Sequence, residues 1–206
     1  MESNLLPVGW TNRLKTQQLL PIFPFPAQLM PDGKLALRIF EPRYLRMVKE
    51  CAQNRSAFGI VMMDCCEVYS RTMAVQPIGT SAKIIDFDQL EHNVLEITVY
   101  GGPCFKINEI KVERDGLNIA NIEYIPLWPA QALTKREHYI AQQLCTIYEQ
   151  YPKLGDLYTS RKLNNLTWLC QRWLEILPLR VGQKQELMAT DTCERTHQLL
   201  TKLLQL

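Results

Sequence analysis

The first half of the chain carries hydrophobic patterns typical of short β-strands. Residues 95–99 alternate between apolar and more polar positions, a period of two that predicts a strand with one buried face. A continuous apolar run over 58–63 has the length of a strand that is buried on both faces. We therefore expect strands from about residue 17 to residue 125, with a hairpin formed by 78–87 and 94–100.

Glycine and proline positions predict where these strands turn. Gly101-Gly102-Pro103 predicts a break after the strand that ends at residue 100, and Asp115-Gly116 supplies the positive φ of a tight turn before a strand over 117–124. Pro42 is placed as at the first position of a helix, because apolar residues recur after it at helical spacing. Many short strands with one helix favour a small curled sheet or an open barrel.

The second half changes to the period of helices. Apolar residues over 140–151 follow one stripe of a helix, and Asn165 is placed to cap a second helix that Pro178 ends. Asp191 stands three residues before a glutamate, the spacing of a capping box, and predicts the start of a last helix. These elements predict a small antiparallel helical bundle.

The two patterns divide the chain into a tail over 1–16, a β-rich part over 17–127 and a helical part over 128–206. The resulting fold class is α+β. The predicted helices carry more apolar surface than a small bundle can bury alone, so we expect the two parts to pack as one unit. Trp128 is placed to seal the join and Trp173 to lie in the shared core. A groove at this junction would then be pre-formed.

Composition narrows the class of protein. The chain has 206 residues with a net charge of +2, and its pI is about 8.1. This balance makes nucleic acid an unlikely partner, because dedicated binders are usually more basic. The start of the chain carries no signal-peptide pattern, and the apolar stretch over 19–30 is interrupted by three prolines. We therefore expect a cytoplasmic protein that does not insert into a membrane.

The cysteines and histidines predict neither a metal site nor a disulfide framework. Seven cysteines are scattered along the chain, which favours reduced thiols packed as small hydrophobic residues. Cys65-Cys66 is the one suggestive pair; packing is the favoured interpretation, with metal or redox chemistry as a minor alternative. His92, His138 and His197 belong to separate predicted elements. We expect no metal and no cofactor.

Catalytic motifs are equally scarce. The nine glycines form no phosphate-binding loop, and no serine stands in a nucleophile elbow or a Ser-x-x-Lys step. Ser81 and Lys83 share a strand face without any predicted oxyanion hole, and Asp86 and Asp88 are best explained as solvated turn acids. The sequence therefore predicts a protein that is not an enzyme.

Several strings, in order along residues 17–206, give the chain a family resemblance. They are Leu20-Pro21-Ile22-Phe23-Pro24-Phe25-Pro26, Leu35-Ala36-Leu37-Arg38-Ile39-Phe40-Glu41-Pro42-Arg43-Tyr44, Phe58-Gly59-Ile60-Val61, Gly79-Thr80-Ser81-Ala82-Lys83-Ile84, Gly101-Gly102-Pro103-Cys104-Phe105-Lys106-Ile107, Leu174-Glu175-Ile176-Leu177-Pro178-Leu179 and Lys184-Gln185-Glu186-Leu187-Met188, followed by Asp191 and Arg195. Together they resemble the substrate-binding N-terminal domain of Lon protease, in the short stand-alone bacterial form that lacks the ATPase and peptidase domains.

The resemblance implies a PUA-like β pseudo-barrel followed by a helical bundle. It also implies a non-catalytic module that recognises unfolded polypeptides or exposed hydrophobic segments. A role beside a protease or chaperone, in proteolysis or protein quality control, is a further expectation from the resemblance. Two places depart from the family pattern: Cys104 stands where many members carry arginine, and residues 65–75 match no family string. An RNA-binding function is the alternative, because many PUA domains bind RNA.

The string over residues 38–44 supplies the candidate polypeptide-binding residues. They are Arg38, Phe40, Glu41, Arg43 and Tyr44. A purely structural interpretation stands beside the binding one, with the two aromatic residues in the core and the three charged residues clamping strand to helix. Arg43, Arg46 and Lys49 recur every third position between glutamates, which favours an ion-paired helix face over a phosphate track.

Overall fold

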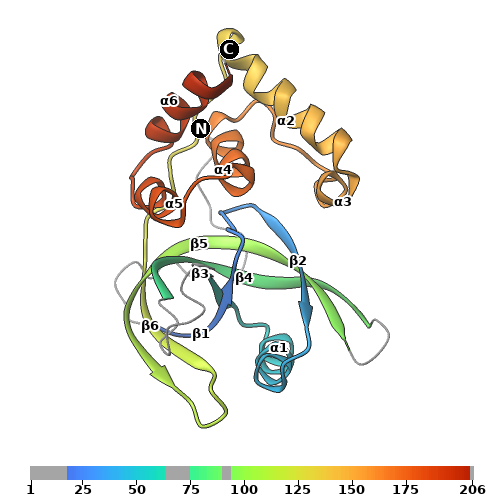
Figure 1. Ribbon diagram of the computed structural model, residues 1–206, viewed down its shortest axis with the longest axis vertical. Coiled ribbons are helices and arrows are strands. Elements are labelled where there is room, and N and C mark those ends of the chain that lie inside the picture. The colour runs from blue at the N-terminus through green and yellow to red at the C-terminus, as the bar shows by residue number, and fades with distance from the viewer. Residues whose placement is uncertain (1–17, 64–74, 90–93, 205–206) are drawn as a thin grey trace.

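A computed structural model describes residues 18–63, 75–89 and 94–204 (Figure 1). The tail over 1–16 and Cys65-Cys66 therefore lie outside the described residues. The strands are β1 (Gln18–Phe25), β2 (Lys34–Ile39), β3 (Phe58–Met63), β4 (Val75–Gln89), β5 (Leu95–Val112) and β6 (Asn118–Tyr124), and the helices are α1 (Pro42–Asn54), η3 (Lys135–Glu137), α2 (His138–Gln150), α3 (Pro152–Gly155), α4 (Leu166–Ile176), α5 (Val181–Met188) and α6 (Glu194–Leu204). Across the described ranges, no helix is long and apolar enough to cross a bilayer.

The six strands form one sheet that closes on itself. The strand order is β2-β5-β4-β3-β1-β6, and β5 pairs with β6 as well, so five strands complete a barrel while β2 stays outside it. β1 and β3 are parallel, and the remaining pairs are antiparallel. α1 packs under the barrel, and the helices after β6 gather at its other side (Figure 1). This arrangement confirms the α+β class that the sequence predicted.

β5 is one long strand, and the break predicted at Gly101-Gly102-Pro103 is wrong. The strand continues through these residues, with a register shift against β4 between Thr80 and Ala82. Gly101 is needed for a different reason: its N–H donates to the Gly33 carbonyl at 2.8 Å, and a Cβ here would collide with the Met30 carbonyl. The glycine thus lets a loop from the start of the chain lie against β5.

Most of the predicted element boundaries are confirmed. α1 begins at Pro42, β3 covers 58–63, and the turn before β6 has Gly116 at φ 84°. The Asn165 side chain caps α4 by accepting a hydrogen bond from the Trp168 N–H at 2.9 Å.

The start of the last helix differs from its prediction. α6 begins at Glu194, so Cys193 rather than Asp191 precedes it, and Thr192 Oγ1 accepts the Glu194 N–H at 3.4 Å. The short helices α3 and α5 were not predicted, because eight residues or fewer give no clear apolar stripe.

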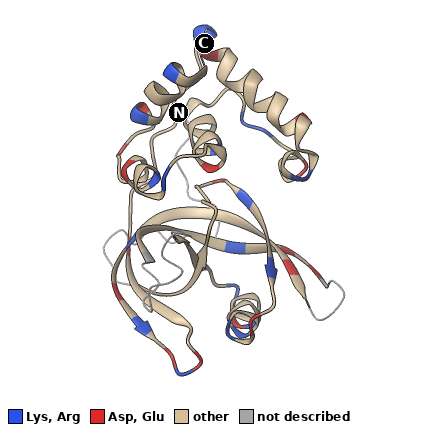
Figure 2. Cartoon of the chain, viewed as in Figure 1, with Lys and Arg blue, Asp and Glu red and all other residues tan. Residues whose placement is uncertain are grey.

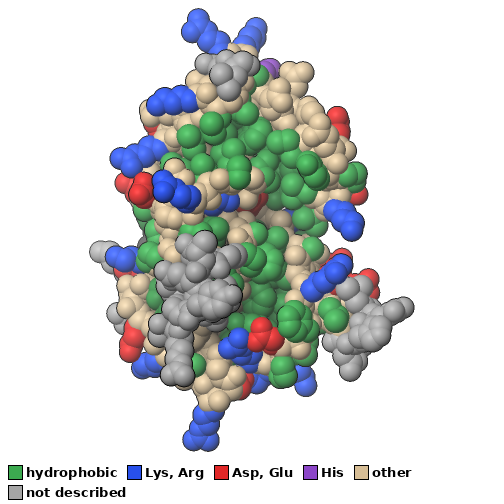
Figure 3. Space-filling view, in the orientation of Figure 1, with side chains coloured by type: hydrophobic (Ala, Val, Ile, Leu, Met, Phe, Trp, Pro, Cys, Tyr) green, Lys and Arg blue, Asp and Glu red, His purple; other side chains and the backbone are tan. Residues whose placement is uncertain are grey.

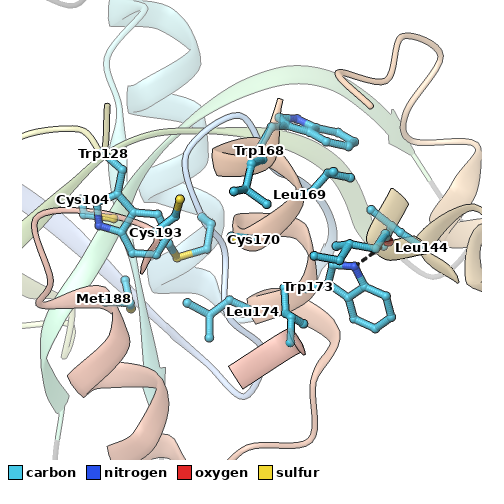
Figure 4. Packing of buried hydrophobic residues seen from close by; sticks show 14 of the residues in the cluster. Cys104, Trp128, Leu144, Trp168, Leu169, Cys170, Trp173, Leu174, Met188 and Cys193 are labelled. Atoms are coloured by element: carbon cyan, nitrogen blue, oxygen red, sulfur yellow. Dashed lines mark hydrogen bonds between the residues drawn. The ribbon is translucent and has the colours of Figure 1, made fainter. Parts of the chain in front are cut away.

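One hydrophobic cluster joins the barrel to the helices. Met30, Ile78 and Cys104 of the barrel half lie in the same cluster as the buried residues of α2, α4 and α6 (Figure 4). Trp128 is buried at the join, and its indole N–H donates to the Thr190 carbonyl at 2.6 Å. The indole N–H of Trp173 donates to the Ile140 carbonyl at 3.1 Å. The two halves therefore share one core.

Candidate functional site

The candidate residues predicted from the sequence lie where β2 leads into α1. Tyr44 is buried against the Phe23 ring, with 4.6 Å between the ring centroids. The Arg43 guanidinium pairs with Glu41 at 2.7 Å and donates to the Gly116 carbonyl at 2.9 Å. Arg38 pairs with Glu96 at the surface at 3.0 Å. Tyr44, Glu41 and Arg43 match the structural interpretation of a core residue and a clamp at the start of α1. Arg38 does not, because its ion pair joins β2 to β5 rather than to the helix.

Phe40 departs from the structural interpretation. Its exposed fraction is 68%, so assigning it to the core was wrong. Leu37 and Ile39 take the buried positions of β2, and the alternation of a strand turns the next residue outward. Phe40 is therefore the aromatic member of the predicted group whose side chain is open to a ligand.

The charged face of α1 is ion-paired at Arg43 and Arg46 as predicted, while Lys49 has no ion pair among the described residues. Arg46 pairs with Glu50 at 3.2 Å and Asp115 at 2.8 Å, and it also contacts Glu113. Figure 2 shows charges of both signs on α1 and on the hairpin between β5 and β6. An open hollow of about 500 Å³ beside Arg43 and Arg46 is lined by these paired groups, so its cations are already neutralised.

A second region, which the motif search did not single out, lies between the two halves. Arg172 of α4 is fully buried, and its Nε donates to Glu175 Oε2 at 2.8 Å. The same guanidinium donates to the Pro31 carbonyl at 2.8 Å, and the Met30 N–H donates to Glu175 Oε1 at 2.8 Å. Burial raises the pKa of Glu175, while the charge and hydrogen bonds of Arg172 oppose that rise. An ion pair on one helix thus holds the loop before β2.

Tyr158 extends this anchor to the start of β2. Its hydroxyl accepts the Lys34 N–H at 3.0 Å and donates to Glu175 Oε2 at 3.4 Å. Gly33 passes so close to Glu175 and Arg172 that a Cβ would collide with both side chains. The absence of a side chain at this position lets the loop seat against α4.

Gln185 of α5 makes a second anchor, on β4. Its Oε1 accepts the Ile78 N–H at 3.0 Å, and its Nε2 donates to the Ile78 carbonyl at 3.0 Å. The contact lies beside the register shift between β3 and β4. A buried carboxamide here binds one residue of main chain in the way that a neighbouring strand would.

A groove of about 270 Å³ opens beside the first anchor. Its walls come from the loop before β2, from β5, from the segment after β6 and from α4. The lining residues include Asp32, Tyr100, Trp128, Ala130, Lys162, Trp168 and Gln171. On the face seen in Figure 3, hydrophobic side chains gather on both sides of the junction.

One wall of the groove is an internally neutralised ion pair. Lys162 Nζ lies 2.7 Å from Asp32 Oδ2, and the Tyr100 hydroxyl donates to Asp32 Oδ1. Burial raises the pKa of Asp32, but the hydrogen bonds from Lys162 and Tyr100 outweigh it and hold the pKa below its ordinary value. Asp32 has φ 61°, a conformation that aspartate and asparagine tolerate better than most residues. This wall contributes little net charge.

Gln171 and Trp168 present unused hydrogen-bonding groups to the groove. Gln171 is 5% exposed, and within the described part of the chain its carboxamide has no hydrogen-bond partner. The same holds for the indole N–H of Trp168, whose ring lies away from Trp173 on α4 (Figure 4). The sequence signal was available: Gln171 and Arg172 are adjacent polar residues inside a helix that is apolar on more than one face.

The groove holds no arrangement typical of catalysis or metal binding. Over the ranges that the structure describes, no cluster of three or more His, Cys, Asp or Glu residues could hold a metal ion. Ser81 is buried and donates to the Pro103 carbonyl at 2.7 Å, and His197 pairs with Glu137 at 3.1 Å. Aromatic walls, a paired charge and free amide groups suit binding.

Comparisons with known proteins agree with this geometry. A Lon N-terminal domain protein from Xanthomonas campestris is 26% identical, with a TM-score of 0.68 over 91% of this chain and 99% of that one. The N-terminal domain of the Mycobacterium avium complex Lon protease shares the fold at 12% identity, with a TM-score of 0.62 over 91% of this chain and 98% of that one.

A third relative is a longer protein. Protein cereblon of Gallus gallus is 25% identical over 114 residues, which are 53% of this chain and 24% of cereblon, so the match spans about a quarter of that protein. The family model of the ATP-dependent protease La (LON) substrate-binding domain matches residues 19–205. With the barrel, the helices and the junction groove in place, the chain belongs to the LON substrate-binding domain family.

Proposed function

We propose that the chain is a non-catalytic recognition module that binds unfolded polypeptide segments in the junction groove. The observation that carries the proposal is a groove with indole walls at the junction of the two halves, which two sets of buried hydrogen bonds join. Aromatic walls with few placed polar groups favour apolar segments whose main chain is accessible. Membership of a substrate-binding family supports a polypeptide ligand.

Delivery of bound segments to a separate protease or chaperone is the role that this module would serve in proteolysis or quality control. Phe40 adds an exposed aromatic side chain that a long unfolded client could contact outside the groove. Glu41, Arg43 and Tyr44 would act indirectly, by holding the start of α1 against β1 and the turn before β6. Arg38 would act by pairing β2 with β5.

Titration with reduced, carboxymethylated casein tests the proposal. We expect saturable binding that native, folded proteins do not compete away. Ala130→Trp should fill the groove, because Ala130 is exposed and lines it, and should weaken binding at least tenfold. Ala52→Trp makes the same change on an exposed face of α1 and should bind like the original chain.

Equal affinity in Ala130→Trp and Ala52→Trp would place the binding surface elsewhere. An absence of saturable casein binding would remove the proposal. Single-stranded RNA belongs in the same titration as a competitor, because displacement of casein at low RNA concentration would favour the RNA-binding alternative.

A further inference from the structure

Gln171 is a buried polar group without a partner at the position where the proposed function needs a contact. Its exposed fraction is 5%, and the described residues offer its carboxamide neither a donor nor an acceptor. Its carboxamide atoms are not fully enclosed, so they can be reached from the groove that Gln171 lines. An unpartnered carboxamide that lines a groove points to a ligand that completes its hydrogen bonds.

Gln185 shows within the same molecule what such a carboxamide can bind. Both glutamines are buried at the junction, one on α4 and one on α5. Gln185 accepts the N–H of Ile78 and donates to its carbonyl, with both bonds at 3.0 Å. This two-bond contact recognises main chain whatever its side chain, which suits a protein that binds many unfolded sequences.

The charge and the volume of the groove restrict the class of ligand further. Because Lys162 neutralises Asp32, the groove favours a neutral peptide group over a chain terminus that carries a full charge. Its volume of about 270 Å³ lies just below the range of small-molecule pockets, which starts at about 300 Å³, and suits one or two residues of an extended chain. The exposed Leu127 in the groove wall can contact an apolar side chain, and the unpartnered indole N–H of Trp168 can donate to a second carbonyl.

We propose that Gln171 binds the main-chain N–H and C=O of one residue of an extended client polypeptide, in the same two-bond arrangement that Gln185 makes with Ile78. This inference rests on the proposed function, because it names the contact by which the groove holds its polypeptide. The chemistry recognised is an internal, neutral peptide unit beside an apolar side chain.

The test uses a neutral peptide of seven residues, capped at both ends, with a central phenylalanine between alternating serines and leucines. Gln171→Met keeps length and packing and removes both hydrogen bonds, so we expect about tenfold weaker binding. Gln143→Met makes the same change on the exposed face of α2 and should bind as the original chain does. Thermal unfolding should show an almost unchanged Tm for Gln171→Met, because the described residues make no hydrogen bond to this carboxamide that the variant would lose.

A backbone scan identifies the contact itself. Each peptide N–H is replaced in turn by N-methyl, and one position should lose about tenfold in affinity for the original chain and almost nothing for Gln171→Met. In ¹H–¹⁵N spectra the carboxamide signals of Gln171 should shift on binding, together with the indole signal of Trp168.

Each contrary outcome has a distinct meaning. If casein and the peptide bind and Ala130→Trp weakens them, but Gln171→Met binds normally, the Gln171 contact is wrong and the groove function stands. A fall in Tm for Gln171→Met that accounts for its lost affinity would make Gln171 a structural residue and overturn the inference. If neither casein nor the peptide binds, the inference and the proposed function fall together.

Discussion

Arg172 and Glu175 form an ion pair, at 2.8 Å between Nε and Oε2, that lies inside the junction and also binds the main chain of the loop before β2. The Arg172 side chain is fully buried, so neither partner can be replaced by water without opening the junction. The two residues are three positions apart on α4, and the loop they hold lies more than 140 residues earlier in the chain. This pair sets one edge of the groove.

Arg172→Met should therefore be strongly destabilising. Removing one partner leaves a buried carboxylate uncompensated, and we expect a loss of about 3–5 kcal/mol in the free energy of unfolding. The measurement is chemical denaturation followed by circular dichroism. The double variant Arg172→Met with Glu175→Met removes both charges and should be less destabilised than Arg172→Met. If the double variant is no more stable than Arg172→Met, the loss in the free energy of unfolding comes mainly from packing rather than from the uncompensated charge.

Asp32 predicts a specific acid dependence of stability. The pKa of Asp32 in the folded chain lies below the ordinary value of 3.8. The ionised carboxylate therefore stabilises the fold fully above pH 3.8, and this stabilisation is lost as the pH falls through the folded pKa. Asp32→Asn tolerates the same backbone and should lower stability at pH 6 by up to about 1 kcal/mol. Its unfolding free energy should also fall less steeply than that of the original chain below about pH 4.

Asp156→Asn, which changes an exposed carboxylate, serves as the control for Asp32→Asn and should leave the pH profile almost unchanged. Parallel profiles for Asp32→Asn and the original chain would show that the Lys162 and Tyr100 contacts do not favour the ionised carboxylate. Urea denaturation at a series of pH values from 2 to 7 distinguishes these results.

Trp173→Ala should destabilise the whole chain in one transition. Trp173 is buried in the cluster that joins both halves, and truncation of such an aromatic side chain typically costs about 3–5 kcal/mol. Differential scanning calorimetry should show one cooperative peak at a lower Tm. Leu203→Ala, at a half-exposed position of α6, should shift the Tm much less. Two separate peaks would contradict the shared core.

Phe40→Ser should affect binding and leave stability almost unchanged. The side chain is exposed, so the free energy of unfolding should change by no more than about 0.5 kcal/mol. Casein affinity should fall about twofold to fivefold if a long client reaches beyond the groove. Phe87→Ser, at another exposed aromatic position, gives the comparison. If casein affinity falls in Phe87→Ser but not in Phe40→Ser, the accessory contact lies at the β4–β5 hairpin instead.

Local patterns were sufficient to predict most of the fold. A continuous apolar run predicted β3 and alternation predicted the first half of β5. Pro42 predicted the start of α1, and Asn165 predicted the start of α4. Gly101 misled because a glycine inside a strand has two explanations, a break or a close approach, and only the tertiary structure distinguishes them.

The candidate site was much harder to predict, because its parts are distant in sequence. Tyr100, Lys162 and Gln171 come from three separate segments, and no local spacing relates them. The string over 38–44 attracted attention for its charged and aromatic residues, yet most of these serve local structure. The buried polar pair on α4 was the better signal, because burial of such groups requires partners.

The hydrogen bond from the Ile78 N–H to Gln185 makes this amide proton a probe of whether the two halves are in contact. That amide proton belongs to the barrel, yet its acceptor belongs to the helical half. Its exchange with heavy water therefore measures how often the halves separate, while amides bonded within the barrel measure unfolding of the sheet. A ligand that bridges the groove would slow exchange at this one proton more than at its neighbours, so occupancy could be followed without any label on the ligand.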